Sequence, residues 1–236
     1  MTDISKTPAR IAGMFDAIAS RYDFLNHLLS AGIDRRWRRA AIRSLALTGR
    51  ERVLDLCTGT ADLAIAARSA SPRAARVVGV DFAGAMLRVG QDKLLAGGLA
   101  DRVTLVRGDA ANVPIRDRSV DAVTIAFGIR NVERTEAACR EMFRVLAPNG
   151  RLAVLEFAIP STPIVRAGYL WYFNHVLPRI GRLVARHEAY GYLPASVGAF
   201  QTPAEFVHLL QQVGFSRVQA HPLTFGIVYL YTAVRL

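Results

Sequence analysis

The segment from Arg52 to Asp81 constrains the fold more than any other part of the chain. Val53 to Leu56 is a short apolar run with one acid in it, which is typical of a buried parallel strand. A turn containing Gly59 follows, then Ala61 to Ser69 with the composition of a helix, then a second apolar run that ends at Asp81. Strand, glycine turn, helix, strand and acid in this order predict the first half of a nucleotide-binding unit.

The glycine turn also indicates which cofactor the unit binds. A dinucleotide fingerprint has the pattern Gly-x-Gly-x-x-Gly, whereas this turn holds only Gly59 and has Ala61 in place of a later glycine. The helix N-terminus still offers backbone N–H groups, and Asp81 can accept hydrogen bonds from two ribose hydroxyls. An adenosyl cofactor without phosphate, such as S-adenosylmethionine, therefore fits better than NAD. The alternative is that the turn is an ordinary feature of any α/β domain.

Composition sets the broad class. The chain has 236 residues, of which 52% are hydrophobic and 21% charged, enough for one α/β domain with an inserted cap. The net charge of +11 favours nucleic acid, an anionic membrane surface or an acidic ligand as partner. Cys57 and Cys139 are expected to be reduced core residues, and the scattered histidines predict no metal site. We expect no signal peptide in residues 1–10 and no membrane span.

The remaining chain continues the alternation of helices and strands. We expect an N-terminal helix from Ile11 that stops at Gly32, and a second helix over 35–45 that Asp34 caps. Five arginines surround Trp37 in that second helix, either as an interfacial surface or as a solvated face with Trp37 packed inward; the spacing favours the latter. Strands are expected at 53–56, 77–80, 103–106, 120–126 and 151–157, with a closing antiparallel pair at 215–219 and 227–234.

This pattern predicts a doubly wound, seven-stranded, mostly parallel sheet in a single domain. The domain has four parts: an N-terminal helical segment (1–50), a cofactor-binding core (51–157), a cap rich in apolar and aromatic residues (158–201), and a closing helix with a strand pair (202–236). A helix over 133–146 should end at Pro148, and a capping box at Thr202 and Glu205 should begin a helix that stops at Gly214.

Polar residues follow the expected strands at the edge where open α/β sheets bind ligands. Asp109 follows the third strand and could bind an adenine amino group, or else serve as a turn acid. Arg130 and Asn131 come just after the fourth strand, on the same side.

Several stretches together resemble one family, the ubiquinone/menaquinone biosynthesis C-methyltransferases. The stretches are Tyr22-Asp23-Phe24-Leu25-Asn26 with Leu29-Ser30-Ala31-Gly32 and Trp37, Leu54 to Asp62, Phe127-Gly128-Ile129-Arg130-Asn131-Val132, and Arg144 to Leu152 with Leu155-Glu156-Phe157. The first and third are specific, whereas the second is general to class I methyltransferases. Asp34 departs from the pattern where the family often has His, and Thr58 and Ala61 replace glycines.

The resemblance implies a class I fold and methyl transfer from S-adenosylmethionine to a ring carbon of a polyprenylated quinol. Demethylmenaquinol is the first expectation and a benzoquinol of ubiquinone biosynthesis the second. By motif, the cofactor-binding residues are Asp55, Gly59, Thr60, Asp81, Asp109 and Ala110.

A quinol carbon becomes a good nucleophile only when its hydroxyl loses proton density. Arg130 is the expected stabiliser of the phenolate, and Asn131 is expected to orient the hydroxyl. Asp23 and His27 are candidate proton acceptors. Substrate contacts are expected from Tyr22, Asn26 and Phe127. The alternative for Arg130 is a salt bridge to an acid at the sheet edge.

The apolar stretch Ile164 to Leu177 is expected to line a channel for the isoprenoid tail. The excess of arginine is expected to hold the protein at an anionic bilayer, on the cytoplasmic face of the membrane, where each nearby charge contributes about 1 kcal/mol. A homodimer is a further expectation, and no nucleic acid is expected as partner. The competing hypotheses are a methyltransferase for a soluble small molecule, a nucleic-acid-binding protein or RNA methyltransferase suggested by charge alone, and a scaffold without activity.

Overall fold

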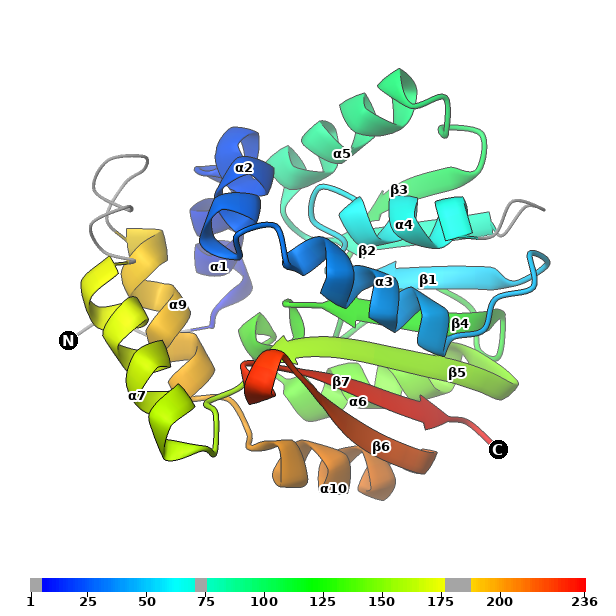
Figure 1. Ribbon diagram of the computed structural model, residues 1–236. Helices are drawn as coiled ribbons and strands as arrows, with labels where there is room; N and C mark the ends of the chain where they lie inside the picture. The colour runs from blue at the N-terminus through cyan, green and yellow to red at the C-terminus, as the bar shows by residue number, and fades with distance from the viewer. Residues whose placement is uncertain (1–5, 71–75, 177–187) are drawn as a thin grey trace.

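The computed structural model describes residues 6–70, 76–176 and 188–236. Its centre is one seven-stranded sheet with the order β3-β2-β1-β4-β5-β7-β6 (Figure 1). The strands are β1 (Arg52–Leu56), β2 (Arg76–Asp81), β3 (Val103–Arg107), β4 (Val120–Ala126), β5 (Leu146–Phe157), β6 (Ser216–Leu223) and β7 (Val228–Val234).

The pairing confirms the predicted doubly wound sheet. Strands β1 to β5 pair in parallel, and β7 pairs antiparallel with both β5 and β6. The chain runs outward from β1 to β3 and then returns to β4 on the other side of β1. This change of direction opens a crevice between β1 and β4 at their carboxyl ends, which is where such sheets bind ligands.

Helices cover both faces of the sheet (Figure 1). On one face α3 (Asp34–Ser44), α4 (Asp62–Ala70) and α5 (Gly84–Ala96) bury a cluster that includes Trp37, Leu63 and Leu94. On the other, α6 (Thr135–Val145) and α10 (Pro203–Val213) bury one that includes Met142 and Phe206. Val53 belongs to the first cluster and Leu54 to the second, because neighbouring strand residues point to opposite faces.

The remaining helices gather beyond the carboxyl ends of the parallel strands (Figure 1). They are α1 (Pro8–Asp16), α2 (Ala19–Leu29), η1 (Ile129–Asn131), α7 (Pro163–Trp171), η2 (Tyr172–Val176), α9 (Glu188–Gly198) and η3 (Thr224–Gly226). The predicted tail channel, Ile164 to Leu177, extends one residue past the described part of the cap, since 177–187 are not described.

The predictions for the two ends of α10 and for the packing of Trp37 are confirmed. Thr202 and Glu205 form the predicted capping box of α10, and Gly214 ends that helix with a φ of 114°. Trp37 packs inward while the neighbouring arginines of α3 are exposed, except for Arg38, which is buried.

Three predictions about element ends were wrong. The expected single N-terminal helix is two, α1 and α2, separated at Ala17 and Ile18. Asp34 does not cap α3 through its side chain, because its carboxylate instead binds side chains around it. The helix expected to run to Leu146 ends at Val145, and Leu146 already pairs with Val120 as the start of β5.

Candidate functional site

The turn between β1 and α4, residues Cys57 to Ala61, is the first half of the site, and we call it the cofactor turn. Its backbone is unusual, since Cys57, Gly59 and Ala61 have φ values of 49°, 55° and 66°. This left-handed conformation costs a residue with a Cβ about 1 kcal/mol or more. Compact burial of the turn maintains it, because Thr58, Gly59, Thr60 and Ala61 are all buried.

Asp81 at the end of β2 holds the cofactor turn in place. The backbone N–H of Gly59 donates to its Oδ2 at 2.9 Å, and that of Ala83 donates to its Oδ1 at 2.8 Å. Burial raises the pKa of this carboxyl above its ordinary value. An ionised carboxylate has about four acceptor positions, so two bonds leave capacity for two more donors. The predicted contact with a pair of ribose hydroxyls is therefore chemically open to Asp81.

Asp55, within β1, binds the cofactor turn through Thr58. It is buried and accepts hydrogen bonds from the hydroxyls of Thr58 at 2.6 Å and Thr124 at 2.7 Å. Burial raises its pKa to about 6. Asp55, Gly59 and Thr60 line a small cavity of about 30 Å³, which we call the Asp55 cavity.

A second space of about 30 Å³, the Asp81 cavity, lies between the cofactor turn and the turn after β4. The two turns touch so closely that a Cβ on Gly128 would lie 2.3 Å from the Cβ of Cys57. Asn131 lines this cavity, and its Nδ2 donates to the Phe127 carbonyl at 3.4 Å. Its Oδ1 is buried and has no hydrogen-bond partner in the described ranges. A buried acceptor without a donor fits a ligand that brings one.

These groups fit an adenosyl cofactor in chemistry, and the N-terminal helices cover the place. Phe15 and Tyr22 wall the Asp81 cavity. Asp16 accepts the backbone N–H of Ala85, at the start of α5, at 2.7 Å. Asp23 accepts the Thr60 hydroxyl at 2.5 Å. Only about 30 Å³ is open in each small cavity, and side chains from α1 and α2 border that space.

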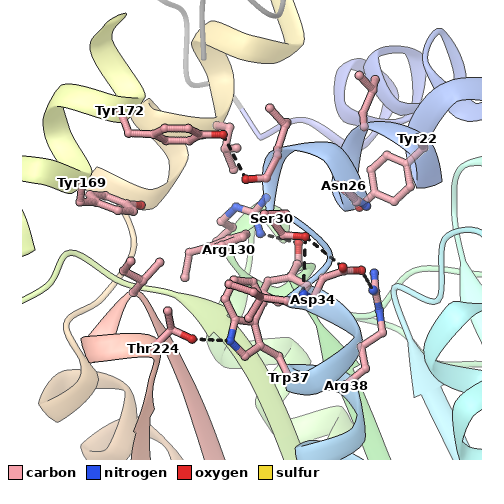
Figure 2. A pocket seen from close by; sticks show the side chains of 18 of the residues that line it. Tyr22, Asn26, Ser30, Asp34, Trp37, Arg38, Arg130, Tyr169, Tyr172 and Thr224 are labelled. Atoms are coloured by element: carbon pink, nitrogen blue, oxygen red, sulfur yellow. Dashed lines mark hydrogen bonds and ion pairs between the residues drawn. The ribbon is translucent and has the colours of Figure 1, made fainter. Parts of the chain in front are cut away.

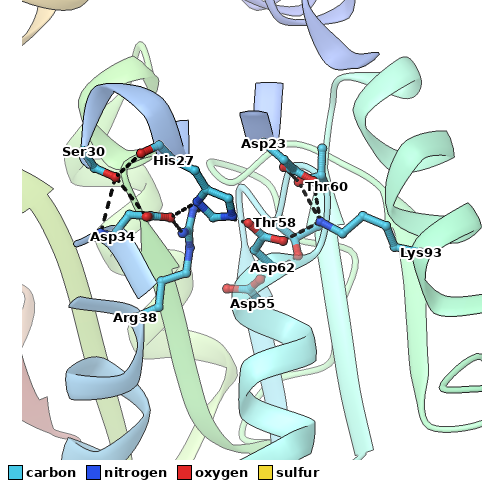
Figure 3. A network of polar contacts seen from close by, with 10 residues as sticks. All are labelled: Asp23, His27, Ser30, Asp34, Arg38, Asp55, Thr58, Thr60, Asp62 and Lys93. Carbon is cyan, nitrogen blue, oxygen red and sulfur yellow. Dashed lines mark hydrogen bonds and ion pairs between the residues drawn. The ribbon is translucent and has the colours of Figure 1, made fainter. Parts of the chain in front are cut away.

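A network of charged contacts ties α2 to the cofactor turn (Figure 3). Asp34 accepts from His27 and Ser30 at 2.9 Å each and pairs with Arg38. These groups lower the pKa of Asp34 although its burial alone would raise it. The contacts continue through the residues Arg38, Asp62, Lys93, Asp23 and Thr60. Five different segments of the chain are thereby joined.

The second half of the site is a cavity of about 490 Å³, which we call the large cavity. Its volume is within the range of small-molecule sites, about 300–1,000 Å³. Its walls come from α1, α2, α3, η1, β5, α7, α9 and η3 (Figure 2). Most of its lining is apolar, from residues that include Met14, Phe15, Ile18, Leu25, Leu29, Ile33, Trp37, Phe127, Phe157, Val165, Leu193 and Ile227.

Arg130 brings a positive charge to the large cavity. Its Nη1 pairs with Glu156 Oε1 at 2.7 Å and also donates to the Phe127 carbonyl, while its Nε donates to Ser196 at 3.4 Å. Arg130 is only 6% exposed and Glu156 is fully buried. In the part of the chain that the structure describes, no hydrogen bond engages its Nη2, so the guanidinium keeps donor capacity. The salt bridge considered as the alternative exists, and Arg130 lines the cavity as well.

The structure places the other predicted residues as follows. Tyr22, Asn26 and Phe127 line the large cavity together with Arg130. Asp23 and His27 do not appear in its lining, because both side chains are held in the network described above. Asp109 closes a turn by accepting the N–H of Ala111 at 2.8 Å, and neither it nor buried Ala110 lines any of the three cavities.

Three residues of the site were missed from the sequence. Glu156 belongs to one of the stretches that carry the family resemblance, and its place near the end of an expected strand could have indicated a role in the site. Lys93 and Tyr192 gave none, because each reaches the site from the middle of a helix. Tyr192 lines the large cavity from α9, and Lys93 joins the network from α5.

The part of the chain that the structure describes holds neither a cluster of metal ligands nor a helix suited to span a membrane. No group of three or more His, Cys, Asp or Glu in these ranges is placed to hold a metal ion. None of the helices within 6–70, 76–176 and 188–236 combines the length and the apolarity that a membrane span requires.

Comparison with known proteins gives concordant matches. The model of the ubiE/COQ5 methyltransferase family matches residues 1–235. A relative from Syntrophotalea carbinolica, named ubiquinone/menaquinone biosynthesis C-methyltransferase UbiE, is 50% identical over 222 residues, 94% of this chain and 92% of that protein. One from Bacteroides fragilis, named demethylmenaquinone methyltransferase, is 39% identical over 232 residues, 98% of this chain and 94% of the relative.

Solved structures agree on the fold. The crystal structure of the [4+2]-cyclase SpnF has a TM-score of 0.72 at 15% identity and covers 99% of this chain and 98% of its own. A SAM-dependent methyltransferase from Aquifex aeolicus has a TM-score of 0.62 at 16% identity and covers 84% of this chain and 89% of its own. Since one of these neighbours is named a cyclase, the fold alone does not define the reaction.

Proposed function

Because this chain belongs to the ubiE/COQ5 methyltransferase family, we propose that it methylates a ring carbon of a polyprenylated quinol. It is an S-adenosylmethionine-dependent C-methyltransferase with a class I fold. Among quinols, we put demethylmenaquinol first and a benzoquinol of ubiquinone biosynthesis second. The relative from B. fragilis is named for demethylmenaquinone and the one from S. carbinolica for both ubiquinone and menaquinone biosynthesis, so the names support a quinol of one of these two pathways.

One observation carries the proposal: the large cavity and the cofactor crevice share two walls. Tyr22 and Phe127 line the large cavity, the Asp81 cavity and the Asp55 cavity alike. An apolar acceptor in the large cavity would therefore lie next to a donor held at Asp81. Holding two reactants side by side in one orientation supplies much of the rate of a displacement reaction.

The reaction needs a nucleophilic ring carbon beside the donor. S-adenosylmethionine, when bound, supplies a methyl group on a positively charged sulfur. Arg130 would stabilise the negative charge that develops on the quinol oxygen, using its Nη2 donors. Glu156 neutralises most of the charge of Arg130 in the absence of a ligand, which makes the burial of the guanidinium tolerable. Asn131 would orient the same hydroxyl from the side of the Asp81 cavity.

The proton acceptor is a separate proposal. Asp23 and His27 lie on α2, which also carries the cavity residues Tyr22 and Asn26. Both are engaged, Asp23 with Thr60 and Lys93 and His27 with Asp34. Either group could reach the quinol only through water or after α2 shifts. We therefore propose that α2 shifts when the cofactor binds, before any proton transfer to these residues.

The surface around the large cavity supports contact with a membrane. Three elements that line it also carry exposed apolar side chains: Phe24 and Leu28 on α2, Ile164 and Trp171 on α7, and Phe225 in η3. A clustering of exposed apolar residues marks an interaction site. We propose that this rim contacts an anionic bilayer on its cytoplasmic face, so that a prenylated substrate enters the cavity from lipid. We also predict that the protein forms a homodimer.

The test is a methylation assay with the purified protein under reducing conditions. With isotope-labelled S-adenosylmethionine, demethylmenaquinol should gain one labelled methyl group by mass spectrometry, and a long prenyl chain should lower KM relative to a short one. A benzoquinol acceptor measures the second candidate directly. Failure with every prenylated quinol, combined with methylation of a soluble phenol, would assign the chain to the competing small-molecule class.

Two variants separate the roles of the two halves of the site. Asp81→Asn should weaken cofactor binding about tenfold or more by calorimetry, because an amide offers fewer acceptors to hydroxyl groups. Arg130→Lys keeps a cation for Glu156 but loses the planar fork, so kcat should fall by about 10²-fold with cofactor affinity unchanged. Normal turnover by Arg130→Lys would remove the guanidinium from the chemistry.

A further inference from the structure

One residue that lines the large cavity carries a buried hydroxyl group without a partner among the described residues. Tyr192 lies on α9, lines the cavity and is only 4% exposed. Its hydroxyl is buried and has no hydrogen-bond partner among the residues that the structure describes. Leaving a buried hydroxyl unpaired is unfavourable, so native proteins rarely do so without a reason. A ligand oxygen in the cavity would remove the cost.

Other hydroxyls of the same lining are already in use. Ser30 donates to Asp34, Tyr172 donates to the Leu29 carbonyl at 3.1 Å, and Thr224 accepts the indole N–H of Trp37 at 2.8 Å (Figure 2). These groups hold the walls together. The Tyr192 hydroxyl holds nothing, so its structural contribution comes from its ring alone.

Tyr192 is also placed relative to Arg130. Ser196, four residues further along α9, accepts a hydrogen bond from Arg130 Nε. Residues four apart lie on one face of a helix, about one turn of 5.4 Å from each other. One face of α9 thus touches the guanidinium at Ser196 and places Tyr192 in the wall of the cavity one turn earlier. Burial raises the pKa of Tyr192, so the group stays neutral and able to donate.

We propose that Tyr192 is a specificity-determining residue that donates a hydrogen bond to the second oxygen of the ring, the one that Arg130 does not hold. This rests on the proposed function, since it presupposes an aromatic acceptor with two oxygens on opposite sides. Arg130 binds the oxygen that becomes negative, and Tyr192 binds the neutral one. An acceptor with a single oxygen would leave the Tyr192 hydroxyl unpaired and would be discriminated against.

The test removes the Tyr192 hydroxyl and the second oxygen of the acceptor, each alone and both together. Two acceptors are compared under reducing conditions: the prenylated naphthoquinol, and the prenylated 1-naphthol that keeps the hydroxyl next to the reacting carbon but has hydrogen in place of the other. The naphthol ring is less activated than the quinol ring, and this difference alone lowers kcat/KM. For the unaltered protein, we expect kcat/KM on the naphthol to fall by at least about a further tenfold. For Tyr192→Phe, kcat/KM should fall about tenfold on the quinol and stay unchanged on the naphthol.

A stability measurement separates this role from a structural one. Because the hydroxyl has no partner in the ligand-free protein, Tyr192→Phe should melt at or above the temperature of the unaltered protein. Tyr229→Phe, in β7 and outside the large cavity, is the matched control and should leave the ratio between the two acceptors unchanged. Equal losses on both acceptors, no loss on either, or a lowered melting temperature would overturn the assignment alone. No turnover of either acceptor by the unaltered protein would overturn it together with the proposed function.

Discussion

Glu51 illustrates how a single carboxylate outside the site can determine the acid stability of the fold. It lies just before β1 and is buried. The backbone N–H groups of Thr48, Gly49 and Arg50 donate to it, as does the Thr48 hydroxyl. Although burial alone would raise its pKa, these donors lower it to about 2 from an ordinary 4.5. The ionised form therefore closes the loop between α3 and β1.

The sign of the pH effect follows from that depressed pKa. The folded protein binds the proton of Glu51 more weakly than the unfolded chain does, so this group stabilises the fold above about pH 4.5 and loses its contribution as the pH falls towards 2. We expect Glu51→Gln to lower the free energy of unfolding by about 2 kcal/mol at pH 7 and to make it less dependent on pH between 4.5 and 2. Urea unfolding at several pH values measures both.

Glu136→Gln is the matched control for Glu51. That carboxylate pairs with Arg140 on the exposed surface of α6. Since exposed pairs contribute little, its substitution should change stability by less than about 0.5 kcal/mol and leave the pH profile parallel to that of the unaltered protein. If both variants changed the free energy of unfolding by the same amount, the loop contacts of Glu51 would contribute no more to stability than an exposed ion pair does.

At the scale of elements, α7 differs from an ordinary surface helix because it carries large apolar side chains both toward the cavity and on its exposed surface. Val165, Tyr169 and the following Tyr172 face the large cavity. Ile164 and Trp171, seven residues apart and hence on one face, are 85% and 60% exposed. A helix with apolar side chains on its exposed surface and a basic residue, here Arg166, beside them is suited to lie on a membrane surface.

We therefore expect the double variant Ile164→Ser, Trp171→Ser to bind anionic liposomes at least tenfold more weakly, because each lost apolar contact removes about 1.5–3 kcal/mol of burial. Co-sedimentation with vesicles of stated anionic content measures this. Binding by the unaltered protein should also weaken with salt, given the exposed arginines of α3 and the net charge of +11. Leu95→Ser, an exposed apolar residue on α5, is the control and should bind normally. Salt-insensitive binding, or none, would count against the bilayer contact.

At the scale of the whole molecule, the charged network decides how firmly the N-terminal helices cover the cofactor crevice. Lys93 lies between Asp23 of α2 and Asp62 of α4. Lys93→Met leaves the two carboxylates without their shared cation, so α2 should open more often. We expect amide hydrogens of residues 19–29 to exchange a few-fold faster, equivalent to about 1 kcal/mol for a partly exposed pair, while those of β1 stay unchanged. Arg140→Gln, which breaks an exposed pair on α6, should leave both segments unaltered.

The core of the fold could be predicted from the sequence because its signals are local. The strand ending at Leu56, the single Gly59 and the acid at Asp81 lie within 30 residues, and their types fix strand, turn and carboxyl end. The capping box at Thr202 is local for the same reason. The Asp34 prediction failed although the partners are near in sequence: Asp34 has the side chain of a cap, but its carboxylate binds the side chains of His27 and Arg38, seven and four residues away, instead of the backbone N–H groups of α3.

The candidate site divides in the same way. Arg130 and Asp81 stood out because they follow buried strands, where a polar residue needs a reason. The pairing of Arg130 with Glu156 depends on which strand lies beside β4, and the sequence alone does not state it. Tyr192 is invisible for a further reason, since an unpaired hydroxyl is defined by the partners that it lacks.

The two aromatic rings that border all three of the cavities described above have a final consequence for ligand binding. A molecule on one side that displaced the ring of Tyr22 or Phe127 would change the space on the other, because both rings line all three cavities. The affinity for the methyl donor and that for the ring acceptor are then thermodynamically linked, and the linkage is reciprocal. A dissociation constant for either compound measured alone would differ from its value when the other is present, by one and the same factor.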